Sequence, residues 1–280
     1  MPAFMSEVGM PYWIDLTTSN PEKSAEFYRR VLGWEVTAET DEYRIGRMQG
    51  LPIGGFIPQP VDSTMPDTWV TYFRAGNLDK ECQRAEELGG RVLSGPQQVE
   101  LGQMALLTDA AGALFGLIEP TNTEQFVAAG EPGLPVWHEL TATDGFAKAL
   151  DFYGELFNWE IRTQSITGSG PVDEADYATA EEEGAPFAGI WNAKGKFPPQ
   201  VGGFWQTYLG VRNMEEAVKA AVDCGGEVIR EPWLSTFGLM ALVADSTGAT
   251  ITLTEVEDAP EDDATEADDL LGLDVEFPEQ

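Results

Sequence analysis

An internal repeat constrains the fold of this chain more than any other feature of its sequence. Three tryptophans of the first half recur in the same order in the second half: Trp13 as Trp137, Trp34 as Trp159 and Trp69 as Trp205. Other matches include Phe27-Tyr28 with Phe152-Tyr153, Tyr43 with Tyr177, Gly89-Gly90 with Gly225-Gly226, and Asp109 with Asp245. The separation between matching residues only grows along the chain, whereas chance matches would scatter. The chain is therefore predicted to contain two copies of one unit of about 120 residues.

Each copy is predicted to fold as β-α-β-β-β twice. In the first copy, residues 12–17 alternate between apolar and polar as a half-buried strand does. Asn20-Pro21 then supplies a helix N-cap, and Gly33 ends the helix. The remaining expected elements are strands at 43–48, 51–57 and 69–73, a helix from Asn77 to Gly89-Gly90, and strands near 91–94, 103–108 and 114–118.

The charge of the chain argues against nucleic acids and membranes as partners. The net charge is −32, which repels phosphate backbones and anionic lipids alike. No apolar run approaches the roughly 20 residues that a membrane span needs. The first 12 residues lack the basic and apolar regions of a secretory signal. We therefore expect a cytoplasmic protein.

Two further features have simple interpretations. The C-terminal segment 257–280 contains eleven acidic residues and no Lys or Arg, which is typical of a solvated, disordered tail. Alternatively, the tail docks through its apolar patch, which consists of Leu270, Leu271, Leu273, Val275 and Phe277. Cys82 and Cys224 lack a CxxC partner or a nearby His, so we expect small buried hydrophobic residues.

Several motifs resemble those of a known superfamily. They are the helix ending Phe-Tyr-x-x-x-Leu-Gly-Trp at 27–34, the Trp-x-Asp/Glu-Leu strands at 13–16 and 137–140, and the closing Asp-x-x-Gly turn. This pattern resembles the vicinal oxygen chelate superfamily of glyoxalases, bleomycin-resistance proteins and extradiol dioxygenases, in particular a tandem glyoxalase-like group common in actinobacteria. The resemblance implies an α+β fold of two tandem domains, in which each pair of βαβββ units forms an incomplete curved β-barrel.

The expected division of the chain follows from the repeat and the resemblance. The parts are an N-terminal lead at 1–8, a first domain at 9–119, a linker at 120–132, a second domain at 133–256 and the acidic tail at 257–280. In the second copy, the segment 162–176 is longer than its counterpart, and its Gly, Ser, Pro and acidic residues predict a mobile loop.

The resemblance also locates the positions from which metal-using relatives take their ligands. In the first copy these positions hold Trp13, Gly54 or Gly55, Val70 and Gly116, and in the second they hold Trp137, Ala188 or Gly189, Gln206 and Thr252. Divalent metals in such sites need His nitrogen or carboxylate oxygen, and at best Gln206 offers one weak oxygen. We therefore expect neither a metal nor another cofactor.

His138 is the only histidine of the chain. Counting back from Tyr153 places it at the first ligand position, whereas matching the Trp-x-Glu-Leu motif places Trp137 there. The alignment that places Trp137 at the ligand position is favoured, because the one extra residue that it requires fits into the Asp144-Gly145 turn. Strand alternation then points His138 away from the face that carries Trp137 and Glu139.

The same alternation predicts the side chains that line each barrel. The expected ligand-binding residues are Trp13, Asp15, Val70, Tyr72 and Arg74 in the first copy, and Trp137, Glu139, Gln206 and Tyr208 in the second. Each set offers an indole, a carboxylate and a phenol. In the alternative interpretation, the carboxylates bond to nearby backbone or to Arg74, and the tyrosines pack in the core. The sequence leaves open which βαβββ units share a cavity.

Three functions are compatible with this lining. The favoured one is a metal-free protein that binds a small aromatic or hydrophobic organic molecule, with cationic molecules included among the candidates. The second is a metal-independent lyase, isomerase or hydrolase with Asp15 or Glu139 as general base and Tyr72 or Tyr208 as acid. A metal-dependent glyoxalase or dioxygenase is the least favoured. Either a monomer or a homodimer would suit the tandem arrangement.

Overall fold

Two eight-stranded sheets, one from each copy of the repeat, dominate the computed structural model. The structure describes residues 3–40, 43–99, 101–121, 126–164, 176–235 and 238–258. The apolar patch of the acidic tail lies outside these residues, as does most of the loop that we predicted at 162–176.

The first sheet has the strand order β3-β4-β5-β2-β6-β9-β8-β7. Its strands are β2 (Pro11–Thr18), β3 (Glu35–Thr40), β4 (Tyr43–Met48), β5 (Leu51–Pro58), β6 (Thr68–Arg74), β7 (Arg91–Val99), β8 (Gly102–Thr108) and β9 (Leu114–Pro120), and its helices are α1 (Pro21–Leu32) and α2 (Leu78–Glu87). The central strands β2 and β6 pair antiparallel, and each pairs in parallel with the last strand of its own βαβββ unit.

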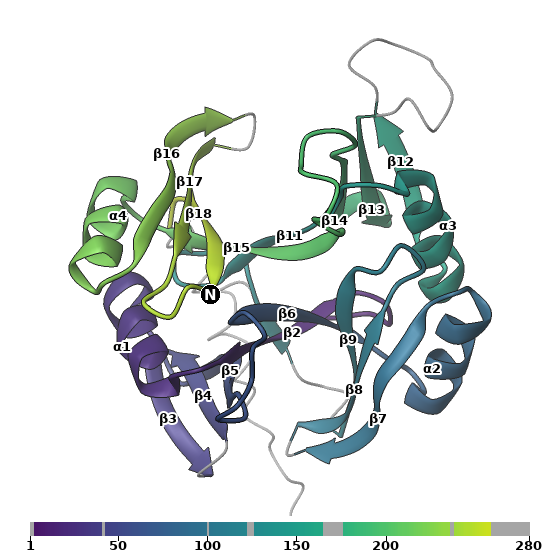
Figure 1. Cartoon of the computed structure of the whole chain (residues 1–280), viewed down its shortest axis with the longest axis horizontal. Helices are drawn as coiled ribbons and strands as arrows, with labels where there is room; N and C mark the ends of the chain where they lie inside the picture. Colours follow the sequence, from purple (N-terminus) through teal and green to yellow (C-terminus); the bar gives the residue numbers. More distant parts are fainter. Residues whose placement is uncertain are drawn as a thin grey trace, which may run out of the picture.

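The second sheet repeats this topology in the order β12-β13-β14-β11-β15-β18-β17-β16. Its strands are β11 (Pro135–Ala142), β12 (Glu160–Gln164), β13 (Tyr177–Glu182), β14 (Ala185–Asn192), β15 (Phe204–Val211), β16 (Glu227–Ser235), β17 (Gly238–Ala244) and β18 (Thr250–Glu255), and its helices are α3 (Phe146–Phe157) and α4 (Met214–Asp223). Both sheets are curved and open, which confirms the predicted pair of incomplete barrels (Figure 1).

The expected caps begin and end the first helix. The side chain of Asn20 accepts a hydrogen bond from the backbone N–H of Lys23, and Gly33 takes a left-handed conformation with φ of 78°. Such a conformation at the C-terminus favours glycine, because it has no Cβ to clash. The equivalent helix of the second copy, α3, instead follows Gly145 and ends at Asn158.

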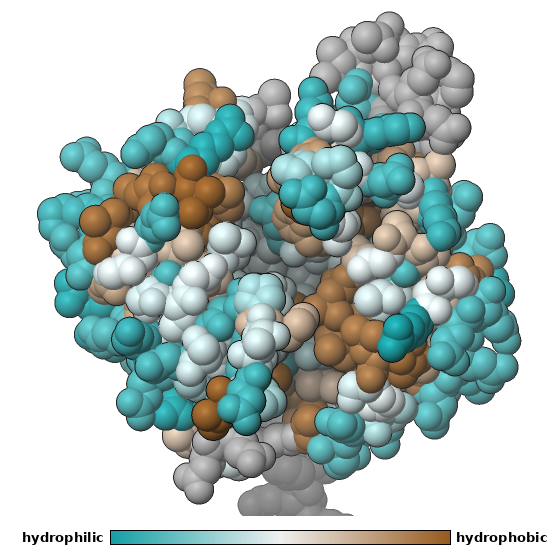
Figure 2. Space-filling model, viewed as in Figure 1, coloured by the Kyte–Doolittle hydropathy of each residue, from teal (hydrophilic) through white to brown (hydrophobic). Residues whose placement is uncertain are grey.

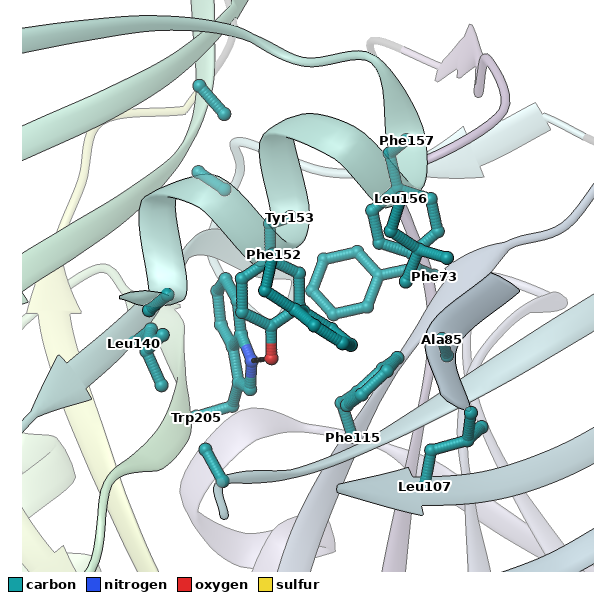
Figure 3. Packing of buried hydrophobic residues seen from close by; sticks show 14 of the residues in the cluster. Phe73, Ala85, Leu107, Phe115, Leu140, Phe152, Tyr153, Leu156, Phe157 and Trp205 are labelled. Carbon is teal, nitrogen blue, oxygen red and sulfur yellow. Dashed lines mark hydrogen bonds between the residues drawn. The ribbon is translucent and has the colours of Figure 1, made fainter. Parts of the chain in front are cut away.

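The hydrophobic cores form between the copies. Helix α1 of the first copy packs beside α4 of the second, and α2 beside α3 (Figure 1). In the core between α2 and α3, Phe73 of the first copy lies 4.9 Å from Trp205 of the second, measured between ring centroids, and contacts Tyr153 of α3 (Figure 3). Each concave face, in contrast, belongs to a single sheet, so both βαβββ units that form it come from the same copy.

Two short strands extend this arrangement in a way that we did not predict. In the lead and the linker, β1 (Ala3–Met5) and β10 (Phe126–Ala128) pair antiparallel as a two-stranded sheet. The lead and the linker therefore contribute regular structure. None of the helices in the described part of the chain combines the length and the apolar composition that a membrane-spanning helix requires.

Candidate functional site

The candidate sites lie on the concave face of each sheet, opposite the helices. On β2, Ile14 and Leu16 belong to the core, so alternation turns Trp13 and Asp15 to the concave face. The pairing register places the same partners around both sites. Asp15 lies between Gly55 of β5 and Val70 of β6, as Glu139 lies between Gly189 of β14 and Gln206 of β15.

In the first site, an indole and a phenol hold a buried carboxylate. Nε1 of Trp13 donates to Oδ1 of Asp15 over 2.9 Å and approaches the Tyr43 hydroxyl at 3.1 Å. The Tyr43 hydroxyl donates to the same Oδ1 over 2.9 Å. Asp15 is fully buried, and its other oxygen, Oδ2, has no hydrogen-bond partner within the described part of the chain. Burial raises the pKa of Asp15 to about 6, although the hydrogen bonds from Trp13 and Tyr43 oppose this rise.

In the second site, two phenols hold the carboxylate by both oxygens. The Tyr177 hydroxyl donates to Oε2 of Glu139 over 2.7 Å, and the Tyr208 hydroxyl donates to Oε1 over 2.9 Å. Nε1 of Trp137 donates to the Tyr177 hydroxyl over 3.1 Å. Burial raises the pKa of Glu139, and both tyrosine hydrogen bonds oppose this rise. The two carboxylates thus differ, because the described residues satisfy both oxygens of Glu139 but one oxygen of Asp15.

More hydrogen-bonding side chains surround the second carboxylate. The Gln206 amide donates to the Thr141 hydroxyl over 2.9 Å and accepts from the Thr252 hydroxyl over 3.3 Å. On β13, the Thr179 hydroxyl donates to Glu181 over 3.0 Å, and Glu181 forms an ion pair with Arg162, also at 3.0 Å. The second concave face is therefore a polar surface.

The two faces also differ in exposure. Trp13 and Tyr72 are buried within a hydrophobic cluster on the first face. On the second face, Trp137 and Gln206 are only partly buried, whereas their counterparts Trp13 and Val70 are buried. Strands β12 to β14 form one end of the second sheet and β16 to β18 form the other. The second face opens between these two ends, where the molecule is hollowed in the upper half of Figure 2. An organic molecule would reach the second indole more easily than the first.

The residues at the superfamily's ligand positions do not fit a divalent metal. A Cβ at Gly55 would lie 2.1 Å from Oδ1 of Asp15, and one at Gly116 would lie 2.0 Å from the Tyr72 ring. In the second copy, a Cβ at Gly189 would lie 2.0 Å from the Tyr177 hydroxyl. Tyrosine side chains thus occupy the space into which ligands would project. Within the described ranges, no three His, Cys, Asp or Glu side chains group as a metal site.

His138 lies between the two sheets, as strand alternation predicts. Its Nδ1 is 3.4 Å from the Thr71 hydroxyl and 3.3 Å from the Thr207 hydroxyl, and both threonines face away from the concave surfaces. Burial lowers the pKa of His138 to about 3, so the ring is neutral at physiological pH.

The other sequence-based site residues fall into two groups. Val70 and Tyr208 lie on the concave faces with Asp15 and Glu139. Arg74 donates instead to the backbone carbonyl of Ser6, so it holds the N-terminal lead. The alternative interpretation predicted hydrogen bonds from Arg74 or nearby backbone to the carboxylates. It was wrong, because tyrosine and tryptophan side chains donate these hydrogen bonds.

The sequence-based list omitted two tyrosines that contact the carboxylates. Tyr43 and Tyr177 begin β4 and β13, and each donates to the carboxylate of its own copy. Their match in the repeat was visible in the sequence. What could not be read there was the register that brings β4 and β13 within reach of β2 and β11.

Two surface hollows lie away from the concave faces. One of about 450 Å³ lies between α1 and α4 and is lined by Arg30, Arg212 and Glu216 among others. The other, of about 470 Å³, is mostly apolar and lies beside α4, where Figure 2 shows apolar residues gathered at the upper left. Neither hollow is lined by Asp15 or Glu139.

The chain is similar to known proteins along nearly its whole length. A sequence model of the Glyoxalase/Bleomycin resistance protein/Dioxygenase superfamily matches residues 12–117 and 138–253. The anthracycline biosynthesis protein DnrV of Streptomyces peucetius is 28% identical over 272 residues, which cover 89% of this chain and 94% of DnrV.

Solved structures share the fold at low sequence identity. The 2,3-dioxygenase LapB of Pseudomonas sp. KL28 is 13% identical with a TM-score of 0.61, covering 93% of this chain and 96% of LapB. The Mn(II)-bound glyoxalase of Novosphingobium aromaticivorans is 14% identical with a TM-score of 0.59, covering 92% of this chain and 85% of the glyoxalase. At this identity the likeness concerns the fold alone.

Proposed function

Because the chain belongs to the Glyoxalase/Bleomycin resistance protein/Dioxygenase superfamily, we propose that it binds a small aromatic or hydrophobic organic molecule without a metal ion. The observation that carries this proposal is the Trp137-Tyr177-Glu139 chain of hydrogen bonds on the open second face. The partly exposed indole offers a flat surface for stacking, and the Tyr177 hydroxyl, which donates to Glu139, accepts the indole N–H and so fixes its orientation.

The charge of the protein and one relative narrow the ligand class. A net charge of −32 attracts cations, and a buried carboxylate favours a cationic or hydroxylated edge of a ligand. DnrV carries the name of an anthracycline biosynthesis protein. The proposed ligand is accordingly a fused-ring aromatic compound with hydroxyl or amino substituents.

Calorimetric titration with an anthracycline tests this proposal. We expect saturable binding to the wild type and an affinity lower by about tenfold or more in Trp137→Ala. Leu93→Ala, a substitution at an exposed position of β7 that lines neither surface hollow, serves as the control and should bind as the wild type does. Mass spectrometry should recover the compound unchanged. Absence of binding to the wild type would reject this ligand class.

A second candidate function is metal-independent catalysis, for which one observation favours Asp15 over Glu139. No described residue is a hydrogen-bond partner of Oδ2 of Asp15, whereas both oxygens of Glu139 accept tyrosine hydrogen bonds. A carboxylate with a pKa of about 6 and a spare oxygen is suited to proton transfer near neutral pH. Turnover of the bound compound that is lost in Asp15→Asn and retained in Glu139→Gln would support this function over binding alone.

Metal-dependent glyoxalase or dioxygenase chemistry is the least supported candidate. Its ligand positions hold Gly55, Val70 and Gly116 in the first copy, and tyrosine side chains occupy the space beside the glycines. Elemental analysis of the freshly purified protein tests this exclusion. Stoichiometric iron, nickel, zinc or manganese would overturn our reading of these positions.

A further inference from the structure

At four equivalent positions of the two concave faces, the first copy has an apolar residue and the second copy has a polar one. Val70 pairs with Asp15 as Gln206 pairs with Glu139. Gly116 pairs with Tyr72 as Thr252 pairs with Tyr208. The other two equivalent pairs are Ile45 with Thr179 and Ile118 with Thr254. In every pair, only the residue of the second copy can form side-chain hydrogen bonds.

The apolar residues of the first face form a closed cluster. Ile45, Val70 and Ile118 are each exposed by 4% or less and pack with Trp13 and Tyr72. The Tyr72 ring also fills the space beside Gly116, where a Cβ would lie only 2.0 Å from the ring. Apart from Oδ2 of Asp15, this face satisfies its surface by packing, and at the four compared positions it offers a ligand no hydrogen-bonding side chain.

The polar residues of the second face are incompletely satisfied. Gln206 bridges Thr141 and Thr252, and Thr179 donates to Glu181. Among the residues that the structure describes, the Thr254 hydroxyl has no hydrogen-bond partner, and its side chain is only 4% exposed. Its neighbours Ile251 and Leu253 belong to the core, so alternation turns Thr254 to the concave face. A buried hydroxyl without a partner costs free energy unless water or a ligand completes it.

We infer that Thr179, Gln206, Thr252 and Thr254 form a hydrogen-bonding subsite of the second face for hydroxyl or amino groups of the ligand, beside the indole of Trp137 that stacks on its flat part. The inference rests on the proposed function and adds that the two copies have diverged. The first copy is a packed support, and the second copy selects ligands by their polar substituents.

A pair of probes separates stacking from hydrogen bonding. An anthracycline that carries an amino sugar provides both the flat rings and the polar groups, whereas its aglycone lacks the amino and hydroxyl groups of the sugar. We expect the wild type to bind the glycoside more tightly. Thr254→Val and Gln206→Met, which keep the shape and remove hydrogen bonding, should each weaken glycoside binding about tenfold and leave aglycone binding within about twofold.

Two control variants make the result specific. Thr254→Ser retains the hydroxyl and should preserve glycoside affinity, and Ile118→Val, at the equivalent position of the first face, should leave the ratio of the two affinities unchanged. Equal losses for both probes, or a change of the ratio caused only by Ile118→Val, would overturn the inference and leave the proposed function intact. Failure of both probes to bind the wild type would overturn the two together.

Discussion

The Tyr43 hydroxyl donates to Oδ1 of Asp15 over 2.9 Å, while Oδ2 of the same carboxylate is buried and has no partner among the described residues. In the second copy, Tyr177 and Tyr208 satisfy both oxygens of Glu139. The duplicated sites therefore differ in how completely their carboxylates are held, and this difference makes the following properties of the protein testable.

Removing the Tyr43 hydroxyl should destabilise the protein. In Tyr43→Phe, the fully buried Asp15 retains only the hydrogen bond from Trp13, so the free energy of unfolding should fall by about 1–3 kcal/mol. The matched variant Tyr177→Phe should lose less, because Glu139 keeps Tyr208 and is 8% exposed. Urea denaturation measures both. A larger loss in Tyr177→Phe would contradict this account.

Asp15 should make the protein less stable as pH rises. Burial raises its pKa in the folded protein to about 6, above the usual value of 3.8, so the folded state binds the proton more tightly. The stabilisation is complete below the unfolded pKa and is lost as pH rises through about 6.

Comparison with Asp15→Asn isolates this effect. Relative to the variant, the wild type should lose about 1–1.5 kcal/mol of unfolding free energy between pH 5 and pH 8. Both measurements lie above the sequence pI of about 4.1, where the protein keeps a negative charge. A difference that is constant across this range would exclude a raised pKa for Asp15.

Adding a methyl group at Gly55 should disrupt the first site. A Cβ there would lie 2.1 Å from Oδ1 of Asp15 and 2.2 Å from the Tyr43 hydroxyl. Since neither group can move without breaking the buried hydrogen bonds, Gly55→Ala should cost about 1–3 kcal/mol or more. Gly95→Ala, whose Cβ would meet nothing within 4 Å, is the control and should be nearly neutral in thermal denaturation.

The shared cores should make the two domains unfold together. Phe73 of the first copy packs against Tyr153 and Trp205 of the second, so Phe73→Ala should destabilise the chain by about 3–5 kcal/mol. We expect one cooperative transition, seen equally by tryptophan fluorescence and by circular dichroism. Two separate transitions would mean that each sheet is stabilised independently.

Removing metal should leave both stability and binding unchanged. Prolonged dialysis against a chelator should have no effect, because the superfamily's ligand positions in the first copy hold Gly55, Val70 and Gly116. Tyrosine side chains fill the space beside the two glycines. The thermal midpoint and the affinity for the anthracycline should be the same before and after dialysis. A drop in either would point to a bound metal.

The sequence by itself determined the features that depend on local order. The repeat established the two domains, and the two-residue period of the strands placed Asp15 and Glu139 on the concave faces and His138 on the opposite face. Caps such as Asn20 and Gly33 located the first helix. These properties follow from the geometry of a single strand or helix, which needs no information from distant parts of the chain.

Tertiary structure alone decided which distant groups meet. The register of β4 against β5 and of β5 against β2 brings Tyr43 to Asp15, and the packing of one sheet on the other makes the cores cross between the copies. A one-residue change of register would turn Tyr43 to the other face without altering the repeat or the alternation. The contacts that define the site therefore depend on long-range pairing, which the order of residues along the chain does not specify.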